Sequence, residues 1–450
     1  MCSRFVVSLL FVIFAGNCFA ESNDLVWPQF RGPNGSGVSD AADVPDEWST
    51  EKNHAWSVNI PGSGYSSPIV IGDRIYLTSA IPDKDEDKAP RGMRAESVRY
   101  AVADTTYDWR VYCLSLVDGS TLWEKSVHVG KAKKGKHPKN SYATETPVSD
   151  GKRVYFYFSQ VGLFAFSLDG KQLWKTDPGT YETFLEYGTS SSPITDGERV
   201  YLQADNEEKA YIAAFNAETG TQVWRADRDE ITSWSTPFLW KNSLRDELVT
   251  VAPRKARAYD PKTGALLWEL GGMSKSTVPV PIADDKYCYV SCGHLADVKN
   301  RPIYAIAPGA KGDISLARGV NQSSFIHWRN PVGAPYVPSP LIYKGHLYIV
   351  HDRPLFDCLN LETGKQAYPR SRFPKAGNFT ASPIATRDKI IVLAEDGLAY
   401  VIDAGDHFHI RQVNLPLDED GLFLATPALA GDSLLLRGAK ALHCIREEKK

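Results

Sequence analysis

The sequence predicts an all-β fold, an eight-bladed β-propeller with four strands in each blade. The first observation is a unit that recurs eight times, seven times with Ser or Thr and once with Val before its first proline. The second is its spacing: successive units lie 79, 46, 44, 44, 59, 43 and 44 residues apart, and about 44 residues hold four strands of ~5–6 residues with short turns. The anchoring prolines are Pro68, Pro147, Pro193, Pro237, Pro281, Pro340, Pro383 and Pro427.

The unit that begins at Ser192 shows the strand pattern most clearly. Apolar segments at 199–202 and 214–216 are rich in β-branched and aromatic residues, which favour strands. The Thr219-Gly220 pair between the last two strands is typical of a tight turn. A proline at the start of an inner strand costs that strand only one backbone donor. Each unit therefore predicts four antiparallel strands.

Large aromatic residues close the successive units. A large ring in an outer strand can wedge between neighbouring sheets and bury ~150–250 Å². We therefore predict a structural role for these residues rather than a ligand-stacking one. They are Trp56, Trp123, Trp174, Trp224, Trp268 and Trp328, with Tyr368 and Phe408 in the equivalent places of the next two units.

The two ends of the repeat region complement each other. The last unit, residues 426–445, has three strands, whereas residues 54–58 look like a fourth strand without the preceding three. We expect the N-terminal strand to complete the last blade and close the ring, because closure removes exposed sheet edges.

The N-terminus predicts export. Arg4 precedes an apolar stretch at 6–15 that is too short to span a bilayer, and Ala20 offers a cleavage point. Cys18 follows Asn17, which fits a lipid-anchored precursor poorly. We predict a signal peptide at 1–20, an N-terminal arm at 21–44 with a flexible Gly-rich stretch, the propeller at 45–446 and a charged tail at 447–450. The location is then secreted or periplasmic, with no transmembrane segment after cleavage.

Composition excludes some partners. A net charge of −3 on 450 residues gives no reason to expect a nucleic-acid partner. Without the cysteines of the first 20 residues, five of the seven remain, and an odd number cannot all pair within one chain. Most lie in apolar strand-like runs, so we expect buried thiols. We expect a monomer.

The spacing Ala214-Phe215-x-x-x-Thr219-Gly220-x-x-x-Trp224 recurs as Ala258-Tyr259-x-x-x-Thr263-Gly264-x-x-x-Trp268. It resembles the tryptophan-docking repeat of the quinoprotein-like (PQQ-repeat) propellers, over residues 45–446. Residues 27–35 also resemble the start of secreted bacterial proteins of this type. The resemblance implies one of two branches: alcohol and sugar dehydrogenases with PQQ and Ca²⁺ on the propeller axis, or non-catalytic propellers such as the outer-membrane assembly propeller, which binds envelope proteins. Fold does not choose between them.

Several dehydrogenase features are missing from the sequence. It has no adjacent cysteine pair, no recognisable Ca²⁺ constellation with a catalytic Asp and no Cys-x-x-Cys-His for haem attachment. Cys288, Cys292 and His294 offer three Zn²⁺ donor types, but alternation places both thiols on one side of a strand, and we predict no metal site. We expect no cofactor.

Strand polarity predicts where a site lies. Turns after the first and third strands of a blade share one face of the disc, and loops after the second and fourth strands share the other. We expect all the long insertions to fall on the second, loop-rich face; they are 78–110, 127–142, 176–191, 291–301 and 329–338. Binding residues concentrate on loops held by a rigid scaffold. The candidates for binding in the axial funnel are His137, Lys139, Asn140, Tyr142, Glu145, Glu186, Tyr187, Trp234, Arg254 and Tyr336, beside Tyr65, Lys275 and Phe379, with His294, His351, Asp352 and Arg353 at the rim.

The mixture of aromatic, basic and acidic residues suits a polar ligand. We predict a non-catalytic binding propeller that engages an envelope or extracellular protein or a glycan through its loop-rich face. The first alternative is a PQQ- and Ca²⁺-dependent oxidoreductase acting on alcohols or sugars. The second is a polysaccharide-active enzyme that uses Glu145 and Glu186, whose carboxyl groups would then lie roughly 5–9.5 Å apart.

Overall fold

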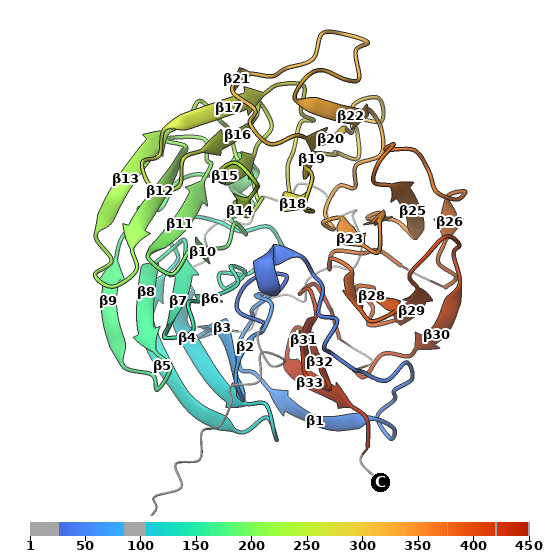
Figure 1. The fold of residues 1–450 in the computed structure, drawn as a ribbon. Coiled ribbons are helices and arrows are strands. Elements are labelled where there is room, and N and C mark those ends of the chain that lie inside the picture. Colours follow the sequence, from blue (N-terminus) through green and yellow to red (C-terminus); the bar gives the residue numbers. More distant parts are fainter. Residues whose placement is uncertain (1–26, 85–104, 376, 419–420, 449–450) are drawn as a thin grey trace, which may run out of the picture.

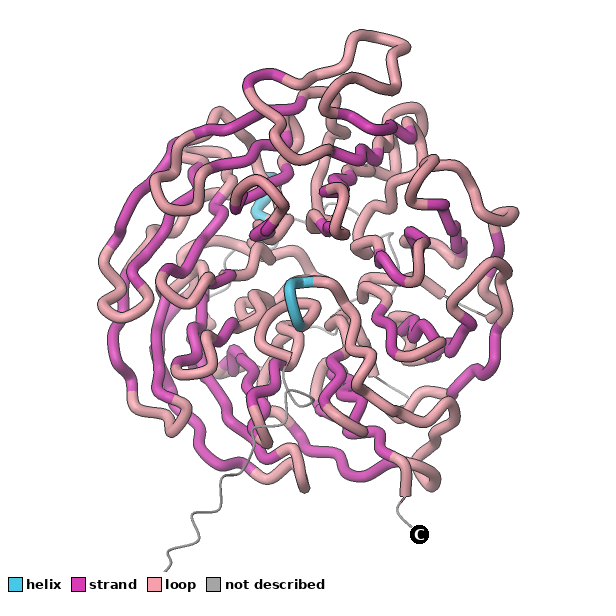
Figure 2. Tube along the Cα trace, viewed as in Figure 1, coloured by secondary structure: helices cyan, strands magenta, loops and turns pink. Residues whose placement is uncertain are grey.

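The computed structural model describes residues 27–84, 105–375, 377–418 and 421–448, and eight sheets stand around a central axis (Figure 1). Strands dominate the described residues. Figure 2 shows two helical turns among them, η2 (Pro33–Gly35) and η3 (Phe184–Glu186). The predicted all-β, eight-bladed propeller is confirmed. No helix in the described ranges is long and apolar enough to cross a membrane.

The first four blades follow one another along the chain, each running from the axis outward. Blade 1 contains β2 (Ile69–Ile71), β3 (Arg74–Pro82), β4 (Thr106–Ser115) and β5 (Thr121–Lys131). Blade 2 contains β6 (Val148–Ser149), β7 (Arg153–Phe158), β8 (Gly162–Ser167) and β9 (Gln172–Thr176). Blade 3 contains β10 (Ile194–Thr195), β11 (Arg199–Ala204), β12 (Tyr211–Asn216) and β13 (Gln222–Asp227). Blade 4 contains β14 (Phe238–Lys241), β15 (Asp246–Val251), β16 (Ala256–Tyr259), β17 (Leu266–Leu270) and the additional β21 (Gly312–Asp313).

The remaining blades complete the circle. Blade 5 contains β18 (Ile282–Ala283), β19 (Cys288–Ser291), β20 (Ile303–Ile306) and β22 (Ile326–Asn330). Blade 6 contains β23 (Leu341–Tyr343), β24 (His346–Val350), β25 (Leu355–Asn360) and β26 (Ser371–Arg372). Blade 7 contains β27 (Ile384–Thr386), β28 (Lys389–Leu393), β29 (Ala399–Asp403) and β30 (Ile410–Asn414). Blade 8 contains β31 (Ala428–Ala430), β32 (Ser433–Arg437), β33 (Ala441–Arg446) and β1 (His54–Asn59).

The N-terminal strand closes the ring, as the sequence predicts. β1 pairs antiparallel with β33, and Trp56 lies opposite Cys444 in that pairing. The outer strand of blade 8 therefore comes from one end of the chain and its three inner strands from the other.

Tryptophans of the outer strands dock onto the following blade at five junctions. In each case the indole Nε1–H donates to a backbone carbonyl of the next blade, over 2.7–3.2 Å. The ring lies on the turn glycine of that blade, where an added Cβ would come within 2.5–2.7 Å of a ring atom. These glycines also have positive φ, which other residues adopt at a cost. The pairs are Trp56 with Gly119, Trp123 with Gly170, Trp174 with Gly220, Trp224 with Gly264 and Trp328 with Gly364.

A ring of hydroxyl groups joins the inner ends of the blades. The residue before the repeat proline donates its backbone N–H to the hydroxyl of the equivalent residue in the next blade, over 2.9–3.2 Å at six junctions. This bond explains why Ser or Thr precedes the proline, a feature that the strand pattern alone leaves unexplained. The members are Ser67, Thr146, Ser192 and Thr236 in one arc and Val280, Ser339, Ser382 and Thr426 in the other.

The junction between blades 4 and 5 departs from this pattern. Trp268 is fully buried, and its Nε1–H donates to Glu247 of its own blade over 2.6 Å. The insertion at 307–325 follows a third strand and supplies β21, which pairs in parallel with β17. The expectation that every long insertion falls on the loop-rich face is therefore wrong at this one place.

The junction between blades 7 and 8 also differs from expectation. Phe408 packs back on blade 6, with ring centroids 5.4 Å from Phe356 and 5.7 Å from Phe373, so it does not dock on blade 8. Trp48 of the N-terminal segment is buried in the core of blades 7, 8 and 1, and its backbone N–H donates to the side chain of Asn414 over 2.8 Å. A tryptophan from outside the repeat thus contributes to the core at this junction.

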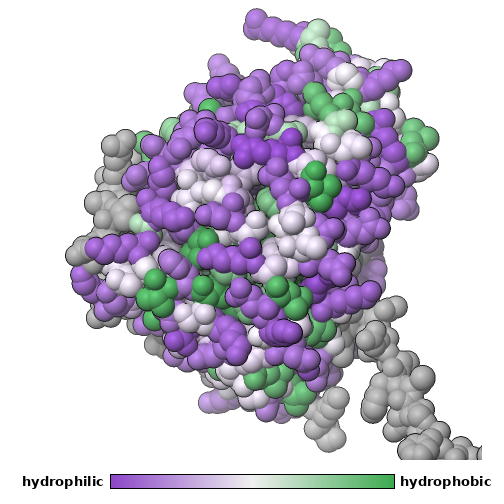
Figure 3. All heavy atoms as spheres, turned by 90° about the vertical axis from the view of Figure 1, so that its left-hand side faces the viewer, coloured by the Kyte–Doolittle hydropathy of each residue, from purple (hydrophilic) through white to green (hydrophobic). Residues whose placement is uncertain are grey.

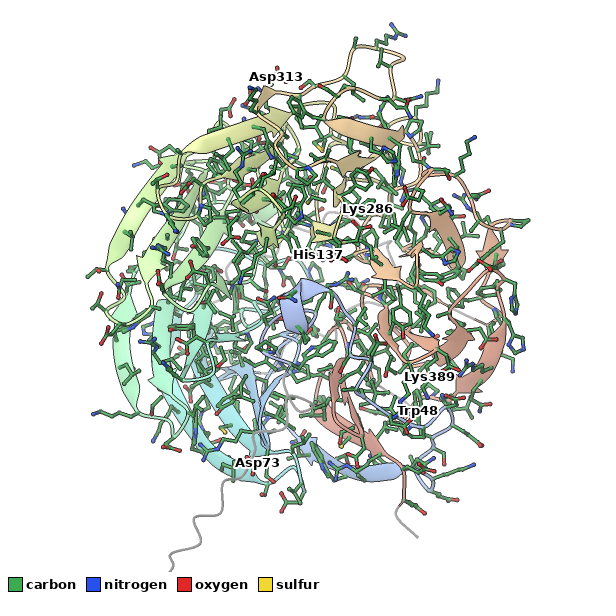
Figure 4. All side chains as sticks on the ribbon, viewed as in Figure 1. Trp48, Asp73, His137, Lys286, Asp313 and Lys389 are labelled. Carbon is green, nitrogen blue, oxygen red and sulfur yellow. The ribbon has the colours of Figure 1, made fainter. Side chains whose placement is uncertain are left out.

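The described part of the N-terminal arm, from Trp27 onward, packs across the face with short turns. Trp27 forms a bridge to Val70 of blade 1, and Val38 forms one to Ala385 of blade 7. Farther along, Asp46 pairs over 2.5 Å with Lys389 of blade 7, which Figure 4 labels. The η2 turn lies in front of the centre of the ring in Figure 1. The Gly-rich stretch thus lies over this end of the axis; its flexibility stays a prediction.

The core lies between adjacent blades, and the five described cysteines are buried and unpaired, as predicted. The side of the rim that faces the viewer in Figure 3 is mostly hydrophilic with separate hydrophobic patches. Leu122, Leu173 and Val223 contribute exposed aliphatic groups there, each next to a docking tryptophan.

Candidate functional site

A cavity of about 440 Å³ opens on the axis at the loop-rich face. Its walls come from the loops that connect one blade to the next, and the hydroxyl ring lines its lower part. Phe30 of the N-terminal arm also lines it, from the side of the plain face. The cavity is therefore a pocket rather than an open channel through the disc.

Six of the ten predicted funnel residues line this cavity. They come from four separate inter-blade loops, which are far apart in the sequence and meet only at the axis. Figure 4 shows His137 near the centre of the ring. Tyr65 and His294, which the sequence also suggested, join them. The six are His137, Lys139, Asn140, Tyr187, Trp234 and Tyr336.

The other four predicted residues lie outside the cavity lining. Tyr142 is buried among blades 1 and 2, and its hydroxyl donates to the carbonyl of Lys134 over 3.0 Å. Arg254 is exposed and donates to the carbonyl of Asp229 over 2.8 Å. Glu145 and Glu186 also lie outside the lining. Their roles in binding remain predictions without support from this cavity.

The remaining rim candidates are also elsewhere. Lys275, Phe379, His351, Asp352 and Arg353 do not line the cavity. Phe379 is buried in the core of blades 6 and 7, and His351 bonds to Asp357 over 2.8 Å in the interior of blade 6.

Glu145 belongs to a buried polar cluster. It accepts a hydrogen bond from the hydroxyl of Thr189, and burial raises the pKa of its carboxyl group to about 7. Neither Glu145 nor Glu186 faces the cavity across which a polysaccharide-active enzyme would need its paired carboxyl groups, so the geometry does not favour that alternative.

Hydrogen bonds between loops hold the aromatic side of the cavity in place. Asn140 donates to the carbonyl groups of Tyr187 and Thr189 over 2.9 and 3.0 Å. The ring of Tyr187 meets that of His137 edge-on at 4.6 Å, and Trp234 donates from its Nε1–H to the carbonyl of Gly188 over 2.8 Å. The loops after blades 1, 2 and 3 therefore position one another.

The lining carries little net charge. Lys139 is its only Lys or Arg among the described residues, and its ammonium group pairs with Glu395 of blade 7 over 2.6 Å. Glu395 also accepts a hydrogen bond from the hydroxyl of Thr380, over 2.6 Å. Across the cavity, burial raises the pKa of Tyr336, so this phenol stays protonated at neutral pH.

The hydroxyl ring is a part of the site that sequence reasoning missed. Each hydroxyl that accepts a neighbouring backbone N–H retains its own proton, which it can donate to a ligand. All eight ring members line the cavity: seven of them carry a hydroxyl, and the eighth, Val280 of blade 5, does not. The repeated Ser or Thr before the proline was the available signal, because strand propensity does not require a hydroxyl there.

Comparisons with known proteins agree with this architecture. The family model of the outer membrane protein assembly factor BamB matches residues 107–280, from β4 to the start of blade 5. The predicted resemblance to the PQQ-repeat propellers is confirmed. No curated protein matches the sequence.

Solved structures extend the likeness to the whole ring. The quinohemoprotein alcohol dehydrogenase from Comamonas testosteroni superposes with a TM-score of 0.63 at 12% identity, covering 96% of this chain and 82% of that one. The quinohemoprotein alcohol dehydrogenase ADHIIG from Pseudomonas putida HK5 gives 0.60 at 12% identity, covering 94% and 81%. The computationally designed Ika8 protein gives 0.57 at 11% identity, covering 87% and 99%. At such identities the likeness is one of fold.

The cavity of this PQQ-repeat-like propeller does not fit the cofactors of the dehydrogenase branch. PQQ is a polycarboxylate, and the dehydrogenases hold it together with Ca²⁺. The described lining residues include no Asp or Glu as a Ca²⁺ ligand, and their single Lys already pairs with Glu395. No group of three or more His, Cys, Asp or Glu elsewhere in the described chain is arranged to hold a metal ion.

Proposed function

We propose that this protein is a non-catalytic binding propeller that acts outside the cytoplasm and takes a neutral carbohydrate in its axial cavity. The observation that carries the proposal is the pairing of a hydroxyl ring with aromatic walls in one pocket. Such a pocket offers apolar surface with a few fixed polar groups, which is the usual composition of a small-molecule site.

The chemistry of the lining favours a sugar over a charged ligand. The hydroxyl ring offers donors and acceptors that match the hydroxyl groups of a sugar. The rings of Tyr187 and Trp234 line the cavity, and aromatic rings attract the weakly positive C–H groups of a sugar. An anionic ligand would have to compete with Glu395 for Lys139, because the pair is already formed.

Titration of the intrinsic fluorescence with soluble neutral oligosaccharides tests this function, because Trp234 lies in the cavity wall. We expect saturable binding of at least one of the cello-, xylo-, malto- and chito-oligosaccharides. Tyr187→Ala should raise its Kd about 10-fold, equivalent to about 1.4 kcal/mol. The matched control is Tyr287→Ala, on the turn between β18 and β19 at the plain face, which should leave the Kd unchanged. Equal effects of the two substitutions would contradict the assignment of the cavity.

Parallel measurements test two other functions, a PQQ-dependent dehydrogenase and a protein-binding propeller. Tight binding of PQQ with Ca²⁺, followed by dye reduction with alcohols or sugars, would replace the proposed function by a dehydrogenase. The partial match to an outer membrane protein assembly factor supports a protein partner as the other binding role. Unchanged capture of a purified envelope protein by Tyr187→Ala, without sugar binding by the wild type, would favour that role.

The location is part of the same proposal and rests on the N-terminal 20 residues, which lie outside the described residues. The mature N-terminus of the exported protein should be Glu21, measurable by mass spectrometry of the secreted or periplasmic fraction. An intact N-terminus on a protein that stays in the cytoplasm would contradict it.

A further inference from the structure

A strained turn stands beside the aromatic side of the cavity. Leu185 and Glu186 have φ values of 50° and 56°, a left-handed conformation that residues with a side chain adopt at a cost in energy. Two such residues in succession persist only where surrounding contacts impose the conformation. Backbone strain of this kind clusters at ligand-binding segments.

Contacts from the loop after blade 3 and within the loop itself impose this conformation. The backbone N–H of Phe184 donates to the hydroxyl of Thr232 over 2.8 Å, and that hydroxyl donates to Glu207 over 2.7 Å. At the other end of the turn, the N–H of Gly188 donates to the hydroxyl of Thr183 over 2.9 Å. The turn is therefore a fixed element of the rim.

The turn presents one aromatic side chain outward and another into the cavity. Phe184 is 48% exposed, whereas Tyr187 lines the cavity. Their ring centroids lie 6.0 Å apart, and a further step of 6.4 Å leads from Tyr187 to Trp234. The three rings form a continuous path from the outer surface to the cavity wall.

Packing does not account for Phe184. A phenylalanine exposed to this extent contributes little to the core, and it lies in no buried hydrophobic cluster of the described residues. The strained turn holds the ring of Phe184 in solvent, next to Tyr187 of the cavity wall. This arrangement is explained if Phe184 contacts a ligand.

We propose that Phe184, Tyr187 and Trp234 form three consecutive subsites, so that the ligand is an oligosaccharide chain that enters over Phe184 and ends in the axial cavity. This inference rests on the proposed function and adds to it the length and direction of the ligand. Each aromatic ring meets one sugar unit, and the two ring-to-ring steps are similar to the length of a sugar unit.

Binding measurements over a series of chain lengths test the three subsites. Wild-type protein should bind the trimer of the recognised sugar about 10-fold more tightly than the monomer. Phe184→Ala should abolish that gain and leave the Kd of the monomer within twofold. Tyr187→Ala should weaken binding at every length. The matched control is Leu244→Ala, an exposed apolar side chain in the turn between β14 and β15 at the plain face, which should change neither.

A second variant tests the strained turn without removing an aromatic ring. The double substitution Leu185→Gly and Glu186→Gly relieves the strain, while the hydrogen bonds of Phe184 and Gly188 still hold the turn. We expect the folded protein to keep its affinity for the monomer and the gain from chain length, since the hydrogen bonds and not these two side chains hold Phe184 in place. Loss of the gain would contradict this account of the turn.

The outcomes separate the two proposals. Failure of every oligosaccharide to bind the wild type overturns the proposed function and this inference together. Binding that does not change with chain length, or a gain with chain length that Phe184→Ala retains, overturns the three-subsite path alone.

Discussion

The junction between blades 3 and 4 and the junction between blades 4 and 5 hold adjacent sheets together in different ways. At the first, Trp224 donates to the carbonyl of Pro261 over 2.9 Å and its ring lies on Gly264. At the second, Trp268 donates to Glu247 within its own blade, and β21 covers its outer side instead. The hydroxyl ring shows the same contrast, since Thr236 accepts a bond from Ser192 whereas Val280 has no hydroxyl to offer Thr236.

The contrast shows that the repeat encodes junctions rather than blades alone. At the junctions that join blades 1 to 2, 2 to 3, 3 to 4 and 5 to 6, a docking tryptophan joins neighbouring sheets at the rim and a hydroxyl joins them at the axis. Where the insertion at 307–325 replaces the docking turn, β21 from that insertion pairs with β17 and joins the two blades at the rim. The inner bond is then left unmade.

The largest effect should come from removing a docking ring at a regular junction. Trp174→Ala leaves a cavity between blades 2 and 3 and removes the bond to the carbonyl of Ala217, so we expect a loss of about 3–5 kcal/mol in the free energy of unfolding. Denaturant titration measures it. The neighbouring Leu173→Ala, at an exposed site on the same strand, should cost less than about 0.5 kcal/mol.

The next largest effect should come from the turn glycines, because their substitution should cost more stability at a docking junction than at the junction between blades 4 and 5. Gly220→Ala introduces a Cβ about 2.5 Å from the ring of Trp174 at a φ of +73°, and we expect a loss of about 3 kcal/mol. Gly309→Ala, in the turn of blade 5, meets only the end of the flexible Leu244 side chain and should cost about 1–2 kcal/mol, from its positive φ. Equal losses in thermal unfolding would show that docking adds nothing to backbone strain.

The buried carboxyl group between blades 2 and 3 should make stability depend on pH. The raised pKa of Glu145, about 7, means that the folded protein binds its proton in a range where the unfolded chain has released it. Stability is therefore highest below about pH 4.5 for this group, and it falls as the pH rises to about 7, by roughly 3 kcal/mol.

Glu145→Gln isolates that contribution. The variant keeps an acceptor for the hydroxyl of Thr189 and has no proton to lose, so its unfolding free energy should fall less between pH 5 and pH 7.5 than that of the wild type. Parallel pH profiles for the two proteins would exclude an unfavourable buried charge.

The smallest effects on stability should come from the hydroxyl ring. Two opposite substitutions test it, one from Thr to Val and one from Val to Thr. Thr236→Val removes the acceptor for the backbone N–H of Ser192 and should cost about 1–2 kcal/mol. Val280→Thr offers Thr236 the missing acceptor and should stabilise the protein by about 0.5–1 kcal/mol. A destabilised Val280→Thr variant would mean that the gap at this junction is set by backbone spacing and not by side-chain chemistry.

The sequence predicted the ring well because its evidence is local and repeated. Turn chemistry, strand alternation and the tryptophan at a fixed spacing recur in each blade, and the unmatched strand at 54–58 required a partner. Insertions interrupt the repeat, so their contacts depend on chain that is remote in sequence. The pairing of β21 with β17 and the arm over the axis could not be read from any local pattern.

The candidate site shows the same division. Tyr187 and Trp234 were found because they lie in loops on the correct face, and strand polarity assigns a loop to a face. Tyr142 and Glu145 lie in those loops too, yet their side chains turn into the interior, since a loop has no fixed alternation to predict direction. Phe30 was missed because nothing in its local sequence indicates that the arm would reach the axis from the opposite face.

Closure by β1 also has a consequence for synthesis. β1 ends at Asn59, whereas its partner β33 begins at Ala441, so nearly the whole chain must be made before the partner strand exists. Until then β1 carries an open edge that can pair with β33 of another copy. Exchange of this strand between two chains competes with closure within one chain, and the competition grows with concentration. The yield of closed monomer during refolding is thus tied to protein concentration by the strand that completes the circle.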